Sequence, residues 1–193
     1  MVNLKKNRTT CYNETIQQIQ FEYRMIIRKA KFEDAAEIAN VHINSWREAY
    51  QDLLPQDFLN DRPLHFKNRY ELWKKVTQNS QMTYVAESKE SGVVGFINGD
   101  SARDEKFKGQ VEVFCIYLLK KFHGQGVGFR LLKKFFETSI EKGFHQSYLW
   151  VLKDNPTIKF YEKAGASFTG DIIKDNIGGI EVEELCYHWS DIR

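Results

Sequence analysis

The spacing of hydrophobic and polar residues predicts two kinds of segment, strands and helices, which alternate along this chain. Short runs rich in β-branched and aromatic residues predict strands, whereas apolar residues that recur every three or four positions predict amphipathic helices. We expect strands at 25–30, 82–88, 93–100, 110–119, 147–152, 167–173 and 180–189. We expect helices at 33–50, 66–78, 126–143 and 155–165.

The order of these elements contains no internal repeat and predicts one α/β (α+β) domain, with a mixed sheet flanked by helices. We place this domain at 25–193. Residues 1–24 are mostly polar and are expected to be an extension outside the core, either a flexible tail or a short helix.

Residues typical of helix ends predict the boundaries of two of these helices. Asp34 followed by Glu37 is expected to form a cap with a return bond at the start of the first helix. In the last helix, Asn155 is expected as the cap, Pro156 at the first helical position and Gly165 just past the end.

Charge and cysteine content narrow the classes of protein. The net charge is +2, from 28 basic and 26 acidic residues, without the basic excess typical of nucleic-acid binders. Three dispersed cysteines match neither a zinc site nor a disulfide framework. No apolar run has the length that spans a bilayer. We therefore expect a cytoplasmic protein without a metal and without a nucleic-acid or membrane partner.

The segment HGQGVGF, residues 123–129, lies where a predicted strand ends and a predicted helix begins. Free backbone N–H groups at a helix start, reached through glycine, suit a phosphate group. The two commonest nucleotide motifs both require glycine where this chain has Phe129. A plain tight turn is the alternative.

Two motifs about thirty residues apart resemble those of the GNAT superfamily of acyl-CoA N-acyltransferases. The first is His123-x-x-Gly126-x-Gly128, with histidine where glutamine or arginine is usual. The second is NPTIKFYEKAGA at 155–166, with Thr157 and Ala166 replacing the usual alanine and phenylalanine. The order of elements from Met25 onward is similar to that family too.

The resemblance implies a GNAT fold, with a mostly antiparallel sheet and two splayed parallel strands at 110–119 and 147–152. It implies that acetyl-CoA binds between these strands, without a metal. The residues implied in this binding are Ile116, Tyr117, Leu118, His123, Gly124, Gln125, Gly126, Val127, Gly128, Phe129, Asn155 and Tyr161. For Asn155, a purely helix-capping role is the alternative.

The resemblance also implies direct transfer to an amine, with Tyr161 as the acid that protonates the departing thiolate. Glu112 is a candidate base. Strict alternation would place Glu112 on one face with Ile116 and Leu118, whereas a bulge in that strand would redirect the side chains. Packing for Tyr161 and a solvent-facing position for Glu112 are the alternatives. His42, Tyr84 and Glu87 are weaker candidate bases.

The acceptor is expected to be a primary amine, of a polyamine or other small molecule or of a peptide. Trp46 and Tyr50, together with Glu112, are candidate acceptor-binding residues, although both aromatic side chains also fit a helix core. A non-catalytic domain that binds acetyl-CoA and a nucleotide-dependent oxidoreductase remain as other readings. A homodimer is possible, as in many members of the superfamily.

Overall fold

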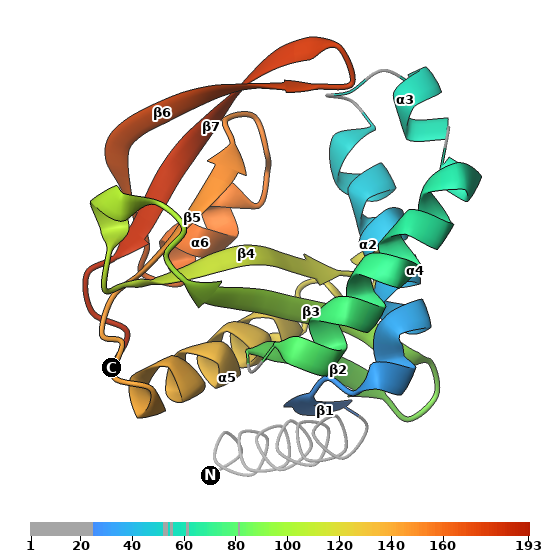
Figure 1. Cartoon of the computed structure of the whole chain (residues 1–193), viewed down its shortest axis with the longest axis horizontal. Coiled ribbons are helices and arrows are strands. Elements are labelled where there is room, and N and C mark those ends of the chain that lie inside the picture. The colour runs from blue at the N-terminus through green and yellow to red at the C-terminus, as the bar shows by residue number, and fades with distance from the viewer. Residues whose placement is uncertain (1–24, 52–53, 55, 61, 81) are drawn as a thin grey trace, which may run out of the picture.

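A computed structural model describes residues 25–193 except 52, 53, 55, 61 and 81 (Figure 1). The expectation for residues 1–24 lies outside the described residues. The strands are β1 (Met25–Lys29), β2 (Thr83–Ser88), β3 (Gly92–Ser101), β4 (Val111–Leu118), β5 (Ser147–Leu152), β6 (Ser167–Ile177) and β7 (Ile180–Trp189). The helices are α2 (Ala35–Tyr50), α3 (Gln56–Asn60), α4 (Arg62–Asn79), α5 (Val127–Glu141) and α6 (Ile158–Lys163).

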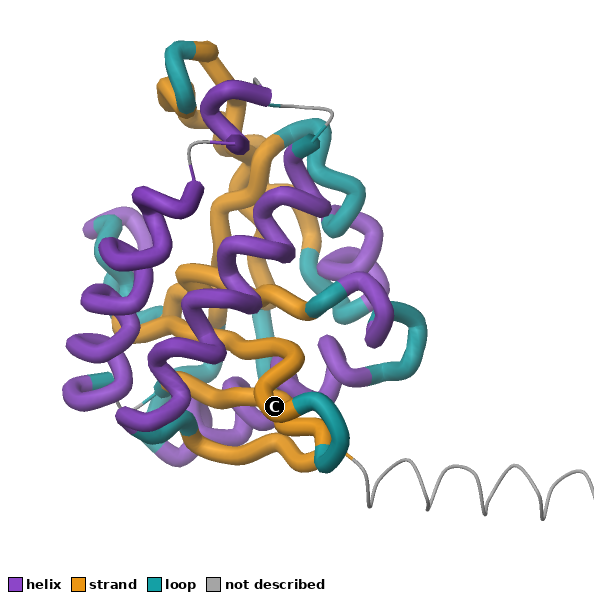
Figure 2. Tube along the Cα trace, turned by 90° about the vertical axis from the view of Figure 1, so that its right-hand side faces the viewer, coloured by secondary structure: helices purple, strands orange, loops and turns teal. Residues whose placement is uncertain are grey.

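The strands form one seven-stranded sheet in the order β1-β2-β3-β4-β5-β7-β6. Every neighbouring pair is antiparallel except β4 and β5, which are parallel. The predicted mixed sheet with one parallel pair, flanked by helices, is therefore confirmed. Seen from the side, helices lie on either side of the strands (Figure 2).

The parallel pair is short. Only Val111 with Ser147 and Glu112 with Tyr148 are register partners. Beyond these positions the two strands diverge, so that β5, β6 and β7 turn away from the first four strands (Figure 1). Both strands therefore leave backbone groups on the edges that face the opening between them.

A bulge in β4 changes which side chains share a face. The register with β3 shifts between Asn98, opposite Cys115, and Gly99, opposite Val113, so that Phe114 is the additional residue. Val113 and Ile116 consequently pack into the same core cluster. The side chains from Glu112 to Ile116 do not alternate strictly between the two faces of the sheet, because the bulge adds one residue.

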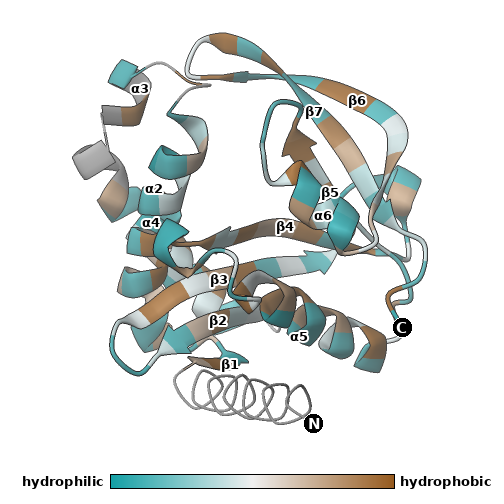
Figure 3. Cartoon of the chain, turned by 180° about the vertical axis from the view of Figure 1, so that it is seen from behind, coloured by the Kyte–Doolittle hydropathy of each residue, from teal (hydrophilic) through white to brown (hydrophobic). Residues whose placement is uncertain are grey.

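Each face of the sheet has its own hydrophobic core. On one face, α5 buries Leu131 and Phe135 against β4 and β5. On the other face, α2 and α4 bury Ile38 and Trp73 against Phe96 of β3. Hydrophobic residues accordingly dominate β4, which is covered from both sides (Figure 3).

Some local expectations are wrong. The Asp34 carboxylate does not cap α2 but accepts two bonds from Arg28, at 2.7 and 2.8 Å, and one from the Lys31 N–H. Glu37 makes no return bond and instead accepts the Val93 N–H. The last helix begins at Ile158 and not at Pro156, after a turn. Helix α3 was not expected from the sequence.

We predict that Gly99→Ala destabilises the fold by about 3 kcal/mol, because it overpacks a closed site. A Cβ atom at Gly99 would lie 2.2 Å from the Glu112 carbonyl oxygen and 2.5 Å from the Phe135 ring. Urea unfolding measures the loss. Ser101→Ala, at an exposed position of the same strand, is the control and should change stability by less than about 0.5 kcal/mol. Equal stability of the two variants would show that β4 can move away from β3.

Candidate active site

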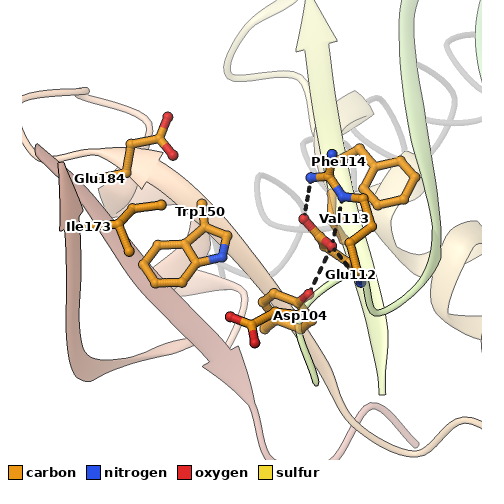
Figure 4. Close-up of a pocket in the computed structure, with 9 residues that line it drawn as sticks. Asp104, Glu112, Val113, Phe114, Trp150, Ile173 and Glu184 are labelled. Carbon is orange, nitrogen blue, oxygen red and sulfur yellow. Dashed lines mark hydrogen bonds and ion pairs between the residues drawn. The ribbon is translucent and has the colours of Figure 1, made fainter. Parts of the chain in front are cut away.

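A cavity of about 530 Å³ opens beside the diverging strands. Its walls come from β4, β5, β6, β7 and the connection between β3 and β4 (Figure 4). The lining residues are Arg103, Asp104, Glu112, Val113, Phe114, Tyr148, Trp150, Ile173 and Glu184. The cavity therefore joins the point where β4 and β5 separate to the face of the β6–β7 hairpin.

Glu112 lies at the point of separation and its carboxylate is fully engaged. Arg103 donates to it from Nε at 3.0 Å, from a terminal nitrogen at 2.5 Å and from the backbone N–H at 3.2 Å. The Tyr148 hydroxyl donates at 2.8 Å. Burial alone would raise the pKa of Glu112, but the bonds from Arg103 and Tyr148 outweigh it and lower that pKa.

These contacts disfavour the hypothesis that Glu112 is the catalytic base. A base needs an accessible lone pair and a pKa near the working pH. Glu112 is 2% exposed, and its oxygens accept four hydrogen bonds. The geometry favours a structural role for this carboxylate, as a clamp between β4, β5 and the β3–β4 connection.

Tyr161 lies on α6 and belongs to the core cluster that includes Val113 and Leu149. Its side chain is buried, and its ring lies against Phe160 and Trp189. Burial, together with the neighbouring Tyr50, raises the pKa of the Tyr161 phenol above its ordinary value. The phenol therefore keeps its proton at neutral pH, and the raised pKa also makes it a weaker acid than an exposed tyrosine.

Trp46, Tyr50, Tyr117 and Asn155 are brought together from α2, β4 and the turn before α6. The Trp46 indole N–H donates to the Tyr117 hydroxyl at 2.7 Å, and the Asn155 amide donates to the Tyr50 hydroxyl at 3.2 Å. Trp46 and Tyr50 also form an edge-to-face pair. These four residues connect the elements on both sides of the opening.

Asn155 does not cap α6, whose N-cap residue is Thr157, but its side chain holds the turn before that helix. Its side-chain oxygen accepts the Thr157 N–H at 2.9 Å and the Thr157 hydroxyl at 2.7 Å. Because its amide nitrogen also reaches Tyr50, this one side chain fixes the turn before α6 and links it to α2.

The glycine loop leaves open space beside its backbone at two glycines. Gly124 and Gly126 have φ of 73° and 76°, which favours glycine, and nothing lies within 4 Å of a Cβ atom built on either. The Arg130 N–H bonds back to the Gly126 carbonyl at 3.1 Å. The N–H groups of Val127, Gly128 and Phe129 have no intrahelical acceptor, because they belong to the first turn of α5.

Side chains of the loop brace its shape. The His123 ring nitrogen Nε2 lies 2.8 Å from the Leu118 carbonyl, and the Gln125 amide donates to the Lys121 carbonyl at 2.9 Å. At the start of α5, the ring of Phe129 meets that of Phe160 with centroids 5.1 Å apart. The two sequence motifs, at α5 and α6, therefore touch.

The weaker candidate bases lie elsewhere. His42 is buried and its Nδ1 accepts from the Trp73 indole at 3.2 Å. The Tyr84 hydroxyl bonds to Thr138, and Glu87 pairs with Arg28. None of the three candidates lines the cavity.

Sequence reasoning missed several cavity residues, Glu184 in particular. In β7, even-numbered positions such as Val182 and Cys186 share a face with Glu184. A carboxylate between apolar residues on one face of a strand was the available signal. Arg103 and Trp150 gave no comparable signal, since each depends on tertiary contacts.

Within the described residues, no group of three or more His, Cys, Asp or Glu side chains is arranged to hold a metal ion. In the same part of the chain, none of the helices has the length and apolar character needed to cross a membrane.

Comparisons with known proteins identify the family of this chain. The model of the acetyltransferase (GNAT) family matches residues 38–166. The uncharacterized N-acetyltransferase YuaI of Bacillus subtilis is 34% identical over 168 residues, which are 86% of this chain and 93% of YuaI. An uncharacterized N-acetyltransferase of Archaeoglobus fulgidus is 26% identical over 133 residues, 68% of this chain and 84% of that protein.

Solved structures share the fold. PaiA N-acetyltransferase from Thermoplasma acidophilum, in complex with coenzyme A, aligns with a TM-score of 0.68 at 20% identity, covering 85% of this chain and 97% of that one. YncA from Salmonella typhimurium, with its cofactor acetyl-CoA, aligns with a TM-score of 0.65 at 19% identity, covering 88% and 94%.

We predict that Glu112→Gln lowers the free energy of unfolding by about 2 kcal/mol at neutral pH, since it removes a charged partner from buried hydrogen bonds. The pKa of Glu112 is lower in the folded protein, so its charge stabilises the fold above the ordinary value of 4.5. That contribution is lost as the pH falls through the lowered pKa. Urea titrations of both proteins should therefore converge in acid. A difference that is constant from pH 7 to pH 3 would contradict the ion-pair role.

Proposed function

Because the chain belongs to the acetyltransferase (GNAT) family and is an acyltransferase, we propose that it transfers an acetyl group from acetyl-CoA to a primary amine. Transfer is direct, from the thioester to the amine of a small molecule or peptide. The observation that carries the proposal is the open glycine loop at the start of α5, beside the diverging strands β4 and β5.

The residues present fit acetyl-CoA. The pyrophosphate would bind the N–H groups from Gly124 to Phe129, where the positive end of the α5 dipole favours negative charge. The N–H of His123 already donates to the Lys120 carbonyl. Gly124 and Gly126 leave the space beside these groups open. Main-chain groups of β4 from Ile116 to Leu118 would pair with the pantetheine arm, because β5 has diverged from this edge.

Tyr161 is the proposed acid. A proton delivered to the thiolate improves the leaving group, and a phenol that stays protonated at neutral pH can supply it. Tyr161 is buried in the same core cluster as Val113 of β4 and Leu149 of β5, the two strands that separate, and this supports the proposal.

The acetyl-CoA site makes a first prediction. Acetyl-CoA should raise the melting temperature of the wild type, and Gly126→Val should weaken its binding at least about tenfold, because the new side chain fills the open side of the loop. Isothermal titration calorimetry measures the dissociation constant. Gly143→Val, at the other end of α5 with φ of 89° and equally open surroundings, is the matched control for backbone strain. Equal binding by both variants would remove the loop from the site.

The acid role makes a second prediction. Tyr161→Phe should lower kcat about 100-fold while leaving the dissociation constant of acetyl-CoA within about twofold, because it deletes only the hydroxyl. Steady-state thiol release and calorimetry separate the two effects. Tyr84→Phe removes a hydroxyl that bonds to Thr138 away from the opening, and its kcat should stay at the wild-type value. A Tyr161→Phe enzyme with wild-type turnover would assign the protonation to water.

A further inference from the structure

The proposed transfer requires a group that accepts a proton from the acceptor ammonium ion. An acceptor amine reaches the protein mostly as an ammonium ion, which has no lone pair until it loses a proton. Glu112 cannot readily take that proton, because Arg103 and Tyr148 occupy its oxygens. A second carboxylate that faces the same cavity is therefore a candidate acceptor of this proton.

Glu184 is a carboxylate in that cavity with a different environment. It stands on β7 between Leu152 of β5 and Ile173 of β6, and it lines the cavity wall opposite Glu112 (Figure 4). Among the described residues, no hydrogen bond or ion pair engages its oxygens. The side chain is half-buried, so it is partly desolvated yet reachable.

The charged and titratable groups around Glu184 come from several elements. Asp175 of β6 acts on it with like charge, and Arg103 of the β3–β4 connection with opposite charge. Tyr50 of α2 senses the charge of Glu184 in turn. Asp104 and Glu112 face the same cavity. Burial first, and then Asp175, raise the pKa of Glu184 above its ordinary value, against the effect of Arg103.

The cavity also has walls that suit an alkylammonium group. Trp150 and Ile173 lie on the Glu184 side, and Phe114 lies on the other (Figure 4). The Phe114 ring already carries the Arg103 guanidinium, 4.2 Å from its centroid. The indole of Trp150 remains as the aromatic surface beside Glu184, and aromatic faces attract cations.

We propose that Glu184 binds the ammonium group of the acceptor and accepts its proton, which makes it the catalytic base of the transfer. This inference rests on the proposed function. It names the acceptor class as alkylammonium compounds whose charged end enters between Glu184 and Trp150, and it assigns Glu112 to the architecture of the cavity.

The proton balance is as follows. Glu184 takes one proton from the ammonium and later releases it to solvent. The amine nitrogen then forms a bond to the acetyl carbon, and the carbon–sulfur bond breaks. The nitrogen gives up a second proton, and the departing sulfur receives one from Tyr161, which regains a proton from the nitrogen through water. The products are the amide, the thiol and one released proton.

Glu184→Gln tests the inference, with Glu183→Gln as the matched control. Glu183 is the adjacent carboxylate of β7, points to the other face and pairs with Lys153 at 2.6 Å. Thiol release from acetyl-CoA is measured with n-butylamine, spermidine and an N-terminal alanine peptide. For each amine that turns over, Glu184→Gln should lower kcat/KM about 100-fold, and Glu183→Gln by less than about threefold.

The pH profile separates a base from a merely structural residue. Because only the ionised carboxylate accepts a proton, wild-type kcat/KM should rise with pH through the pKa of Glu184, and this limb should be missing in Glu184→Gln. The residual rate of the variant should also follow free amine, rising with pH toward the pKa of the amine. An acidic limb retained unchanged in the variant overturns the inference.

A binding measurement covers the case in which none of the three amines turns over. With coenzyme A bound, n-butylamine should shift the 13C carboxyl signal of Glu184, which is assigned by its loss in Glu184→Gln. An unmoved signal overturns the inference. Acetyl-CoA should stabilise wild type and both variants alike. Failure to stabilise wild type would sink the proposed function, whereas stabilisation with a fully active Glu184→Gln would sink only the role of Glu184.

Discussion

The short parallel pairing of β4 with β5 is the constraint on which the site depends. Two register pairs hold the strands together, and the buried Glu112 carboxylate lies at the second of them. A buried carboxylate is tolerated only when it is paired and hydrogen-bonded, and Arg103 with Tyr148 meets that requirement. The clamp closes one end of the pair, and the strands are free to diverge from there.

Because β4 and β5 diverge, two surfaces become accessible: the edge of β4 and one face of the β6–β7 hairpin. Along β4, backbone groups that would have paired with β5 become available to an extended ligand. Beside β5, the turned hairpin of β6 and β7 exposes a face that lines the cavity. The glycine loop lies between the 3-10 helix Lys120–Phe122, which follows β4, and the start of α5. Contact between Phe129 and Phe160 then fixes α5 relative to α6, which carries Tyr161.

The sequence was sufficient for those parts of the site that depend on local conformation. Glycines with positive φ and a strand followed by a helix are set by neighbouring residues, and they were predicted. Asn155 was predicted as a helix cap, but its side chain accepts the Thr157 N–H in the turn before α6. The partners of Glu112 were not predicted, because Tyr148 lies 36 residues away and becomes a neighbour only through the parallel pairing. The bulge at Phe114 was foreseen only by resemblance, since it depends on the register with β3. Asp34 was misread as a cap because Arg28, on the preceding strand, competes for the carboxylate.

The two glutamates of the cavity illustrate why residue type and strand position do not determine chemistry. Both are partly withdrawn from water, and burial alone would raise both pKa values. Arg103 reverses that effect for Glu112 through direct hydrogen bonds, but it acts on Glu184 only from a distance, where Asp175 opposes it. Hydrogen bonds from Arg103 and Tyr148 therefore lower the pKa of Glu112, whereas the pKa of Glu184 is raised. The different pKa directions of the two glutamates thus depend on tertiary contacts in the β3–β4 connection and in β5, which motif analysis does not reveal.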